Sequence, residues 1–215
     1  MNLLKSHLNN LFCICVGGME CTGSTFVWQL VNHLYPFKVQ KIHHYDVSYN
    51  LVIVTYRDPR DVICSYAKRQ LKGIDNPTLL DERLFDAIKI LFLQNKRHID
   101  VYRYLESRNT ILIKYEEFIA HRQYELLKLI EICCKRNLDH NQRVKVLEEF
   151  SLSKNKERSA ERKSFNVYDP KDQIHGNHIS SNGAVGVWKN ILKDEHLSII
   201  YKELGSFFDD FNYEI

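Results

Sequence analysis

Two kinds of hydrophobic pattern alternate along the chain. An unbroken apolar run at 11–16 predicts a strand buried on both faces, and the β-branched runs at 51–55 and 110–114 predict two more strands. A weaker alternating segment at 37–42 predicts one more strand. Helical spacing of apolar residues predicts helices from Ser24 to before Pro36, over 59–71 and 80–105, around 126–134, from Asp139 onward and over 194–211. Strands that alternate with helices indicate an α/β protein with a parallel sheet.

The domain organisation follows from length and composition. The 215 residues are 44% hydrophobic and 27% charged, which is enough for one well-filled core, so we expect a single domain over 1–215. The stretch 153–183 is polar and has few periodic apolar positions. We therefore expect a loop or lid over 153–190.

Charge and cysteine usage exclude several classes. Thirty basic and 27 acidic residues give a net charge of +3, which is too balanced for nucleic acid or an anionic membrane to be the main partner. No apolar run approaches the ~18 residues of a membrane span, and polar residues interrupt the N-terminus where a leader would need its apolar core. Six cysteines without a repeated C-x-x-C spacing indicate reduced thiols and no metal site. We expect a cytoplasmic protein.

A glycine-bearing loop follows the first predicted strand. Gly18-Met-Glu-Cys-Thr-Gly23-Ser24-Thr25 has the G-x4-G spacing of a phosphate-binding loop, but Ser24 stands where lysine belongs. Backbone amides at a helix N-terminus and neighbouring hydroxyl groups are suited to bind an anion. A plain glycine turn with an N-capping serine explains the same residues equally well.

A second polar motif follows the strand at 51–55. Arg57-Asp-Pro-Arg-Asp-Val-Ile-Cys-Ser65-Tyr66 lies where open α/β sheets place their ligands. Arg57 is suited to bind phosphate with two parallel hydrogen bonds. The alternative is that Arg57 and Arg60 pair with Asp58 and Asp61 as a solvated helix start.

These two motifs resemble those of the sulfotransferase family that uses 3′-phosphoadenosine 5′-phosphosulfate. The family has P-K-S-G-T-T-W after its first strand and R-[ND]-P-[RK]-D-V-x-x-S-x-Y after a later one. The resemblance implies that Arg57 and Ser65 hold the 3′-phosphate. It assigns the 5′-phosphosulfate to Thr22, Gly23, Ser24 and Thr25, and the aromatic position to Phe26. It also implies a P-loop-NTPase-like parallel sheet flanked by helices.

Two further segments resemble the family in the expected order. Lys41-Ile42-His43 is similar to K-T-H, which implies that His43 is the general base and that Lys41 belongs to the catalytic site. Gly183-Ala-Val-Gly186-Val-Trp188-Lys189 is similar to the loop that closes over the nucleotide, and it assigns Gly183, Gly186 and Lys189 to nucleotide binding. We expect Trp188 to be a packing residue. His44, Asp46 and Glu20 compete with His43 for the role of the base.

The chain also departs from the family. Cys21 replaces the loop lysine, and Ser181-Asn182 replaces a basic pair before Gly183. Lys41, Arg60 or Lys189 are alternatives for the first lost cation. Arg158, Arg162 and Lys163 are alternatives for the second, unless they form an ordinary solvated loop. Only eight residues, 43–50, separate two predicted strands, fewer than a parallel crossover usually needs.

The sequence thus predicts transfer of a sulfuryl group from 3′-phosphoadenosine 5′-phosphosulfate to the hydroxyl or amine of a small molecule or glycan. Two alternatives stay open. One is a P-loop kinase acting on a small molecule, and the other is a degenerate protein that binds the nucleotide without turnover. The replacement of the loop lysine by Cys21 favours the second alternative.

Overall fold

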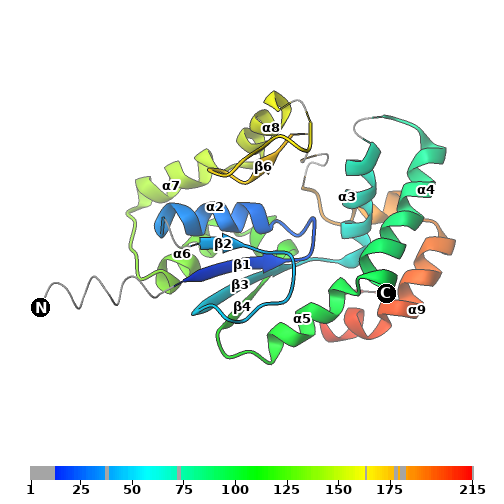
Figure 1. Cartoon of the computed structure of the whole chain (residues 1–215), viewed down its shortest axis with the longest axis horizontal. Coiled ribbons are helices and arrows are strands. Elements are labelled where there is room, and N and C mark those ends of the chain that lie inside the picture. Colours follow the sequence, from blue (N-terminus) through cyan, green and yellow to red (C-terminus); the bar gives the residue numbers. More distant parts are fainter. Residues whose placement is uncertain are drawn as a thin grey trace, which may run out of the picture.

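The centre of the molecule is a four-stranded parallel sheet with the order β2-β1-β3-β4 (Figure 1). The computed structural model describes residues 13–36, 39–71, 74–162, 164–176, 179 and 183–214. The strands are β1 (Ile14–Gly18), β2 (Val39–Lys41), β3 (Leu51–Tyr56) and β4 (Thr110–Lys114). The prediction of an α/β protein with a parallel sheet is confirmed, and the sheet flanked by helices is P-loop-NTPase-like.

Helices connect and cover the strands. They are α2 (Ser24–Leu34), α3 (Pro59–Leu71), α4 (Pro77–Ile88), α5 (Arg97–Leu105), α6 (Gln123–Cys133), α7 (His140–Glu149), α8 (Leu152–Glu161) and α9 (Asp194–Asp210). Shorter elements are the π-helical turns η1 (Lys89–Gln94) and η2 (Tyr115–Ile119), the 3-10 turn η3 (Val187–Asn190) and a hairpin of β5 (Tyr168–Asp169) and β6 (Ile174–His175). No helix in the described ranges combines the length and the apolar character that crossing a membrane requires.

Two predictions about elements were wrong. The single helix expected over 80–105 is divided into α4, η1 and α5, and it breaks at Lys96, whose backbone is left-handed (φ 47°). The loop expected from residue 153 begins instead with α8, which Ser151 caps by accepting a hydrogen bond from the amide of Lys154. The prediction failed because α8 is short and packs through polar side chains, so the sequence lacks the periodic apolar residues that indicate a helix.

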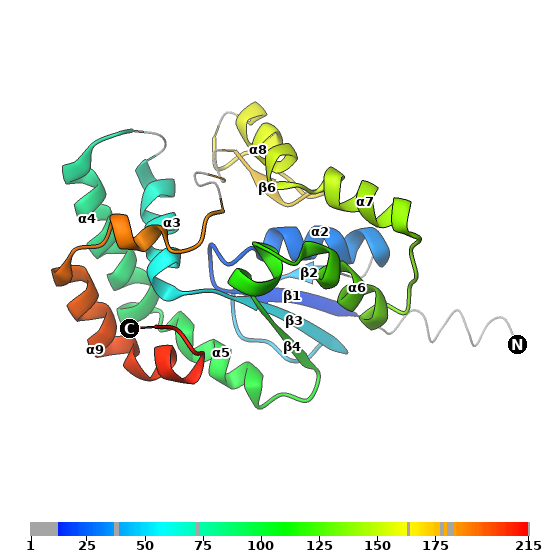
Figure 2. The same ribbon diagram turned by 180° about the vertical axis from the view of Figure 1, so that it is seen from behind.

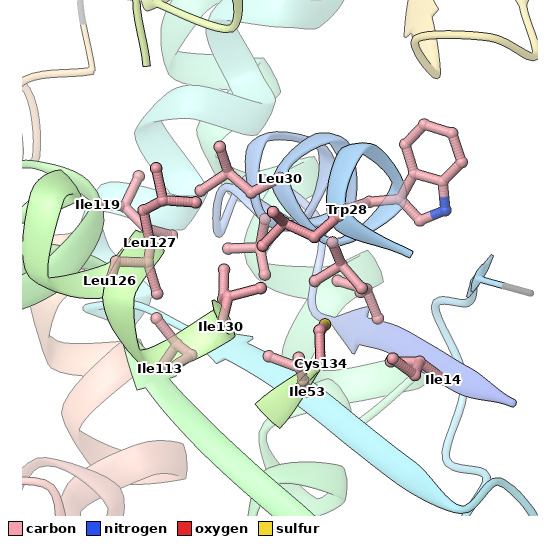
Figure 3. Close-up of a cluster of buried hydrophobic side chains, with 14 of the residues drawn as sticks. Ile14, Trp28, Leu30, Ile53, Ile113, Ile119, Leu126, Leu127, Ile130 and Cys134 are labelled. Carbon is pink, nitrogen blue, oxygen red and sulfur yellow. The ribbon is translucent and has the colours of Figure 1, made fainter. Parts of the chain in front are cut away.

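A large apolar cluster joins one face of the sheet to α2 and α6. Ile14, Ile53 and Ile113 point from three adjacent strands toward Leu30 of α2 and Ile130 of α6 (Figure 3). These five side chains are at most 1% exposed. Burial of their apolar surface stabilises the fold by about 25 cal/mol for each Å² removed from water. It also fixes α2 behind the first loop.

The opposite face of the sheet is covered by the segment 42–50 and by α5. Tyr45, Val47 and Tyr49 pack against a buried group that includes Val52 and Tyr104. This irregular segment, and not a helix, carries the chain from β2 to β3. The short connection therefore does not displace β2, which pairs in parallel with β1 and places Lys41 opposite Val16.

A third cluster lies beyond the carboxyl end of the sheet. It joins α3, α4, η1 and α9, which stand together in the view from behind (Figure 2). Ile63, Leu84, Leu204 and Phe207 are each at most 1% exposed within it. This packing holds α3 and gives the helix that follows Arg57 a fixed position.

We expect Gly18→Ala to lower the free energy of unfolding by about 2–4 kcal/mol. Gly18 has a φ of 142°, and an added Cβ would lie 2.4 Å from Oγ1 and 2.5 Å from the carbonyl oxygen of Thr55. Chemical denaturation measures the change. The control is Gly205→Ala in α9, where an added Cβ meets nothing within 4 Å and the helix gains about 0.5–1 kcal/mol. Equal stability of the Gly18 variant and the wild type would contradict the expectation.

Candidate active site

A cavity of about 550 Å³ opens where the four parallel strands end. The loop after β1, the end of β2, Arg57 after β3 with one face of α3, and η2 after β4 all contribute to its wall. Of the residues that the family resemblance assigns to the site, those that line it are Gly23, Ser24, Thr25, Phe26, Lys41, His43, Arg57, Ser65 and Gly183. Residues from distant parts of the sequence therefore meet at the edge where ligands bind in open α/β sheets.

The first loop is held in a turned conformation beneath the cavity. Gly18, Cys21 and Gly23 have positive φ angles, which lets the backbone turn tightly before α2 begins. The Thr22 hydroxyl donates to the carbonyl of Met19 at 2.7 Å and lies 2.6 Å from the hydroxyl of Thr55. Thr22 is fully buried and does not line the cavity, so its hydroxyl fixes the loop and only its backbone remains for a ligand.

Lys41 brings a positive charge to the loop. Its Nζ donates to Oγ1 of Thr25 at 2.5 Å, although the two residues come from β2 and from the first turn of α2. Burial, followed by the charge of Arg69, lowers the pKa of Lys41 to about 8. Lys41 is therefore mostly protonated at neutral pH, and it supplies a cation beside the loop in which Cys21 replaces lysine.

His43 is placed beside the same loop with a defined tautomer. Its Nδ1 lies 3.1 Å from the carbonyl oxygen of Gly18. A carbonyl only accepts, so Nδ1 carries the proton and Nε2 is left as a proton acceptor. The side chain is partly exposed, but desolvation by the surrounding loops, followed by the charge of Lys41, lowers the pKa of His43 below its usual 6.5 and keeps the ring neutral at pH 7.

The competing bases are placed less well. His44 and Asp46 do not line the cavity, and the Asp46 carboxylate accepts from the amide of Ser48 at 2.8 Å. Glu20 lines the cavity, but its carboxylate lies 3.8 Å from the guanidinium of Arg97. Arg97 also donates to the carbonyl of His43 at 2.9 Å and so holds the turn that carries the histidine.

Arg57 connects the first loop to the late loop. Its Nη1 donates to the carbonyl of Cys21 at 3.3 Å and its Nη2 to the carbonyl of Ala184 at 2.8 Å. The guanidinium lies 4.1 Å from the ring centre of Tyr115 and 3.5 Å from the Asp61 carboxylate. Its Nε is buried and has no hydrogen-bond partner among the described residues. A buried arginine with an unused donor beside a cavity is suited to bind an anion.

The late loop is anchored by Asp61. Its carboxylate accepts from the amide of Gly186 at 2.7 Å and from that of Trp188 at 3.1 Å. Tyr115 donates to the carbonyl of Gly183 at 2.9 Å. The structure does not bring Gly186 or Lys189 to the cavity wall, and Lys189 is exposed with Nζ 5.7 Å from the ring centre of Trp188.

The other candidate cations are engaged elsewhere. Arg60 is buried, pairs with Asp58 at 2.8 Å and lies 3.8 Å from the ring centre of Trp188, which confirms that the tryptophan packs. The ion pairing that the alternative interpretation describes does form, as Arg57–Asp61 and Arg60–Asp58, but both pairs are buried and not solvated. Lys163 lies outside the described residues.

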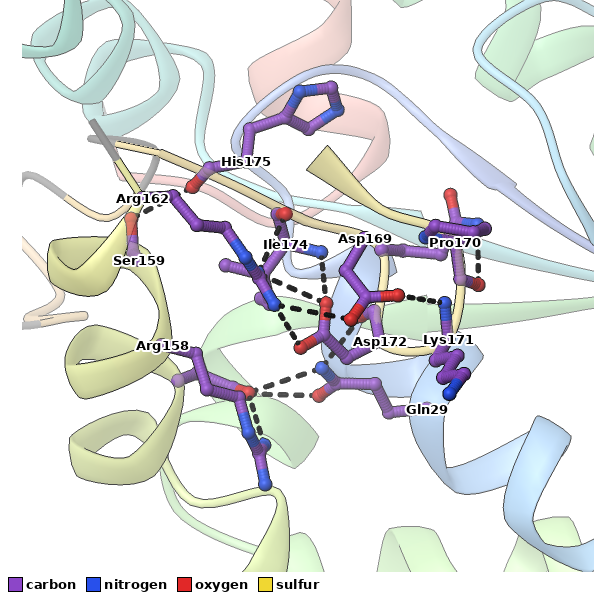
Figure 4. Close-up of polar contacts among 12 residues, drawn as sticks. Gln29, Arg158, Ser159, Arg162, Asp169, Pro170, Lys171, Asp172, Ile174 and His175 are labelled. Atoms are coloured by element: carbon purple, nitrogen blue, oxygen red, sulfur yellow. Dashed lines mark hydrogen bonds and ion pairs between the residues drawn. The ribbon is translucent and has the colours of Figure 1, made fainter. Parts of the chain in front are cut away.

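Arg162, the residue that follows α8, fixes the hairpin that borders the cavity. Arg162 pairs with Asp172 at 2.7 Å, and Gln29 of α2 donates to the carbonyl of Asp172 at 2.8 Å (Figure 4). Arg158 pairs with Glu149. Neither arginine lines the cavity. The structure therefore gives Arg162 a role in holding β5 and β6 and Arg158 a role in joining α8 to Glu149, and it does not place either as a substitute for the missing phosphate-binding arginine.

Sequence reasoning missed several lining residues. Tyr115 and Arg69 both line the cavity, as do Phe165 and His175 of the hairpin region. Arg69 had a detectable signal, because it stands four residues after Ser65 and shares its helical face. Phe165 and His175 had no such signal in the sequence, because the region around the hairpin has no periodic hydrophobic pattern.

The described residues hold one group of three potential metal ligands, outside the cavity. Asp81, Glu195 and His196 offer ligand atoms within 4.8 Å of one another. The Nζ of Lys193 lies 2.7 Å from the Asp81 carboxylate. A lysine cation already balances the acidic charge of this group.

Solved structures with a similar fold include a sulfotransferase and a retinol dehydratase. Mouse sulfotransferase SULT7A1 complexed with PAP matches with a TM-score of 0.64 and 14% identity, covering 93% of this chain and 88% of that one. Retinol dehydratase matches in complexes with retinol and PAP (TM-score 0.64, 13% identity, 97% and 86% covered) and with androsterone and PAP (0.63, 14%, 96% and 85%). At these identities the likeness shows the fold.

Sequence comparison adds the family. No curated protein matches the chain. The model of the sulfotransferase domain matches residues 47–206, about three quarters of the sequence, including Arg57, Ser65 and the late loop. The glycine loop and the Lys41-Ile42-His43 segment precede the matched range, and the fold brings them to the same cavity. The chain belongs to the sulfotransferase domain family.

Proposed function

We propose that the protein transfers a sulfuryl group from 3′-phosphoadenosine 5′-phosphosulfate to a hydroxyl or amine of a small molecule or glycan. The observation that carries the proposal is the meeting of Arg57, Ser65, Lys41 and His43 in one cavity at the carboxyl end of a parallel sheet. A cytoplasmic location is part of the proposal and is supported by the six free thiols.

The 3′-phosphate is assigned to Arg57 and Ser65. Ser65 lines the cavity from the second turn of α3, and Arg57 precedes the same helix. The buried Nε of Arg57 lacks a partner among the described residues, so an incoming phosphate oxygen would satisfy a donor that is now costly. The fit of these residues to an anion rests on this unsatisfied donor.

The 5′-phosphosulfate is assigned to the loop before α2. Gly23, Ser24 and Thr25 line the cavity at the helix N-terminus, where backbone amides and the helix dipole favour an anion. Lys41 reaches the same helix turn through Thr25. Its charge is placed to stabilise the negative charge that develops on the departing phosphate oxygen.

The reaction is an in-line displacement at sulfur. The acceptor oxygen or nitrogen attacks sulfur, and the bond between sulfur and the bridging phosphate oxygen breaks. Nε2 of His43 takes the proton of the acceptor, and the electron pair of the broken bond leaves on 3′-phosphoadenosine 5′-phosphate. His43 is neutral before the step because its pKa is lowered.

The two rival functions make different predictions. A P-loop kinase would bind ATP with magnesium better than the 3′-phosphorylated nucleotide, and its loop would need the lysine that Ser24 replaces. A degenerate protein would bind 3′-phosphoadenosine 5′-phosphate without catalysing transfer. Lys41 beside Thr25 argues against degeneracy, because the lost loop charge has a neighbour that supplies one.

We expect 3′-phosphoadenosine 5′-phosphate to bind more tightly than AMP, and Arg57→Ala to lose about 1.5–3 kcal/mol of that preference. Calorimetry with both nucleotides measures it. Because Arg57 also supports two loops, Ser65→Ala is a milder second variant, with an expected loss of about 0.5–1.5 kcal/mol.

The control is Lys189→Ala, which removes a positive charge outside the cavity and should leave both affinities unchanged. Equal affinity of the wild type for the two nucleotides would sink the assignment of the 3′-phosphate site. Tighter binding of ATP with magnesium would support the kinase.

A further inference from the structure

Arg69 is a cation of the cavity wall to which the proposed nucleotide site gives no role. It projects from α3 and lines the cavity together with Ser65, one helical turn earlier. Within the described ranges, Arg69 forms no ion pair and no hydrogen bond, and its guanidinium contacts two aromatic rings. A partly buried guanidinium with unused donors indicates a ligand.

The two rings fix the direction of the guanidinium. Its Cζ lies 4.8 Å from the ring centre of Tyr66 and 5.4 Å from that of Phe165, and both aromatic residues line the cavity. Phe165 stacks on His175 with ring centres 4.5 Å apart. Contacts with ring faces leave the N–H groups in the guanidinium plane available, and these are the groups that bind a carboxylate or phosphate in pairs.

The charge balance of the cavity also points to an anion. Its described lining carries three cationic side chains, Lys41, Arg57 and Arg69, and one acidic side chain, Glu20. Glu20 is balanced by Arg97 at 3.8 Å. Arg57 and Lys41 serve the two charged ends of the nucleotide under the proposed function. Arg69 is left over.

The position of Arg69 favours the acceptor side over the 3′-phosphate. Arg69 stands four residues, about 6 Å along the helix axis, beyond Ser65, on the side away from the end of β3 that carries Arg57. Its charge instead acts on Lys41 and contributes to the lowered pKa of that lysine. Arg69 thus lies toward the end of the cavity where Lys41 and His43 face the reacting groups.

We propose that Arg69 binds an anionic group of the acceptor, so that the natural acceptor is a hydroxyl or amine compound carrying a carboxylate, sulfate or phosphate. Tyr66 and Phe165 form the apolar wall on which the body of such a compound packs. This inference rests on the proposed sulfotransferase function.

The test compares two probes that differ in charge and hardly in size, 4-hydroxyphenylacetate and 4-hydroxyphenylacetamide. Calorimetry measures their binding to the full chain, with and without saturating 3′-phosphoadenosine 5′-phosphate. We expect the wild type to prefer the carboxylate about tenfold or more, which is the effect of a hydrogen-bonded charge pair. Arg69→Gln should abolish the preference, and Arg69→Lys should retain part of it.

The matched control is Lys68→Gln, which removes one positive charge from the same turn of α3 at a residue that does not line the cavity. It should keep the preference of the wild type. Circular dichroism and a thermal melt show whether each variant is folded. Equal binding of the two probes, no binding of the carboxylate, or a preference that survives Arg69→Gln overturns the proposal.

The affinity of the Arg69→Gln variant for 3′-phosphoadenosine 5′-phosphate separates this proposal from the function on which it rests. If Arg69→Gln weakens 3′-phosphoadenosine 5′-phosphate binding about tenfold or more, Arg69 belongs to the nucleotide site, and the acceptor proposal is wrong while the proposed function stands. If the wild type does not bind this nucleotide at all, the proposed function fails. That failure appears in the nucleotide titration and not in the comparison of the two probes.

Discussion

Replacing Lys41 by methionine should lower the turnover of sulfuryl transfer by about 10²–10³, the usual cost of losing one preorganised donor in the transition state. Lys41 lies 2.5 Å from Oγ1 of Thr25, at the helix N-terminus that is assigned to the 5′-phosphosulfate. Methionine has a similar length and no charge. Nucleotide affinity should change much less than turnover, because the charge on the bridging oxygen develops only as the bond breaks.

The pH dependence of the wild type identifies the group. The pKa of Lys41 is lowered to about 8, so the ammonium loses its proton as the pH rises through that value and transfer should slow there. Arg69, His43, Glu20 and Arg97 are the charged or titratable groups near this end of the cavity. Lys41→Arg keeps its charge at higher pH and should move the alkaline fall of the rate upward.

A double variant tests whether Lys41 replaces the lost loop cation. Cys21→Lys restores lysine at the family's position, and in the Lys41→Met background it should recover part of the rate. Single-turnover kinetics measure the chemical step apart from product release. Full activity of Lys41→Met would show that no charge is needed from this residue. If the double variant is no faster than Lys41→Met alone, Lys41 has a different function from that of the loop lysine.

Much of the sheet and of its edge could be predicted because the signals were local. The apolar runs of β1, β3 and β4 are typical of strands in a parallel sheet, and parallel pairing places the residues that follow them at one edge. Arg57, Ser65, Lys41 and His43 are each identified by a short motif next to a strand end, and the structure brings all four to the cavity.

The rest depended on contacts between distant segments. The use of the irregular segment 42–50 as a connection depends on Tyr45, Val47 and Tyr49 packing on a sheet face, which no local pattern announces. Lys189 was assigned by its motif, but Asp61 holds the loop so that the lysine stands outside the cavity. The polar helix α8 is held in place by ion pairs and amide hydrogen bonds. Such contacts do not need periodic apolar residues, so the sequence carries no helical hydrophobic pattern there.

The second large effect is expected at His43. The preceding strand, β2, pairs in parallel with β1, so His43 lies just past a carboxyl end. The Gly18 carbonyl fixes the proton on Nδ1, and desolvation together with the charge of Lys41 keeps the ring neutral by lowering its pKa. His43→Ala should therefore lower turnover by about 10²–10⁴, the usual contribution of a positioned general base.

Nucleotide affinity should hardly change in His43→Ala, because proton transfer matters only in the reacting complex. The wild-type rate should fall on the acid side at a pH below 6.5, where His43 gains a proton, and this limb should vanish in the variant. His44→Ala is the matched control, since His44 does not line the cavity. If His43→Ala keeps the turnover of the wild type and His44→Ala loses it, His44 is the general base. Activity that survives both substitutions would exclude histidine as the base and make Glu20, the acidic residue of the cavity wall, the next to test.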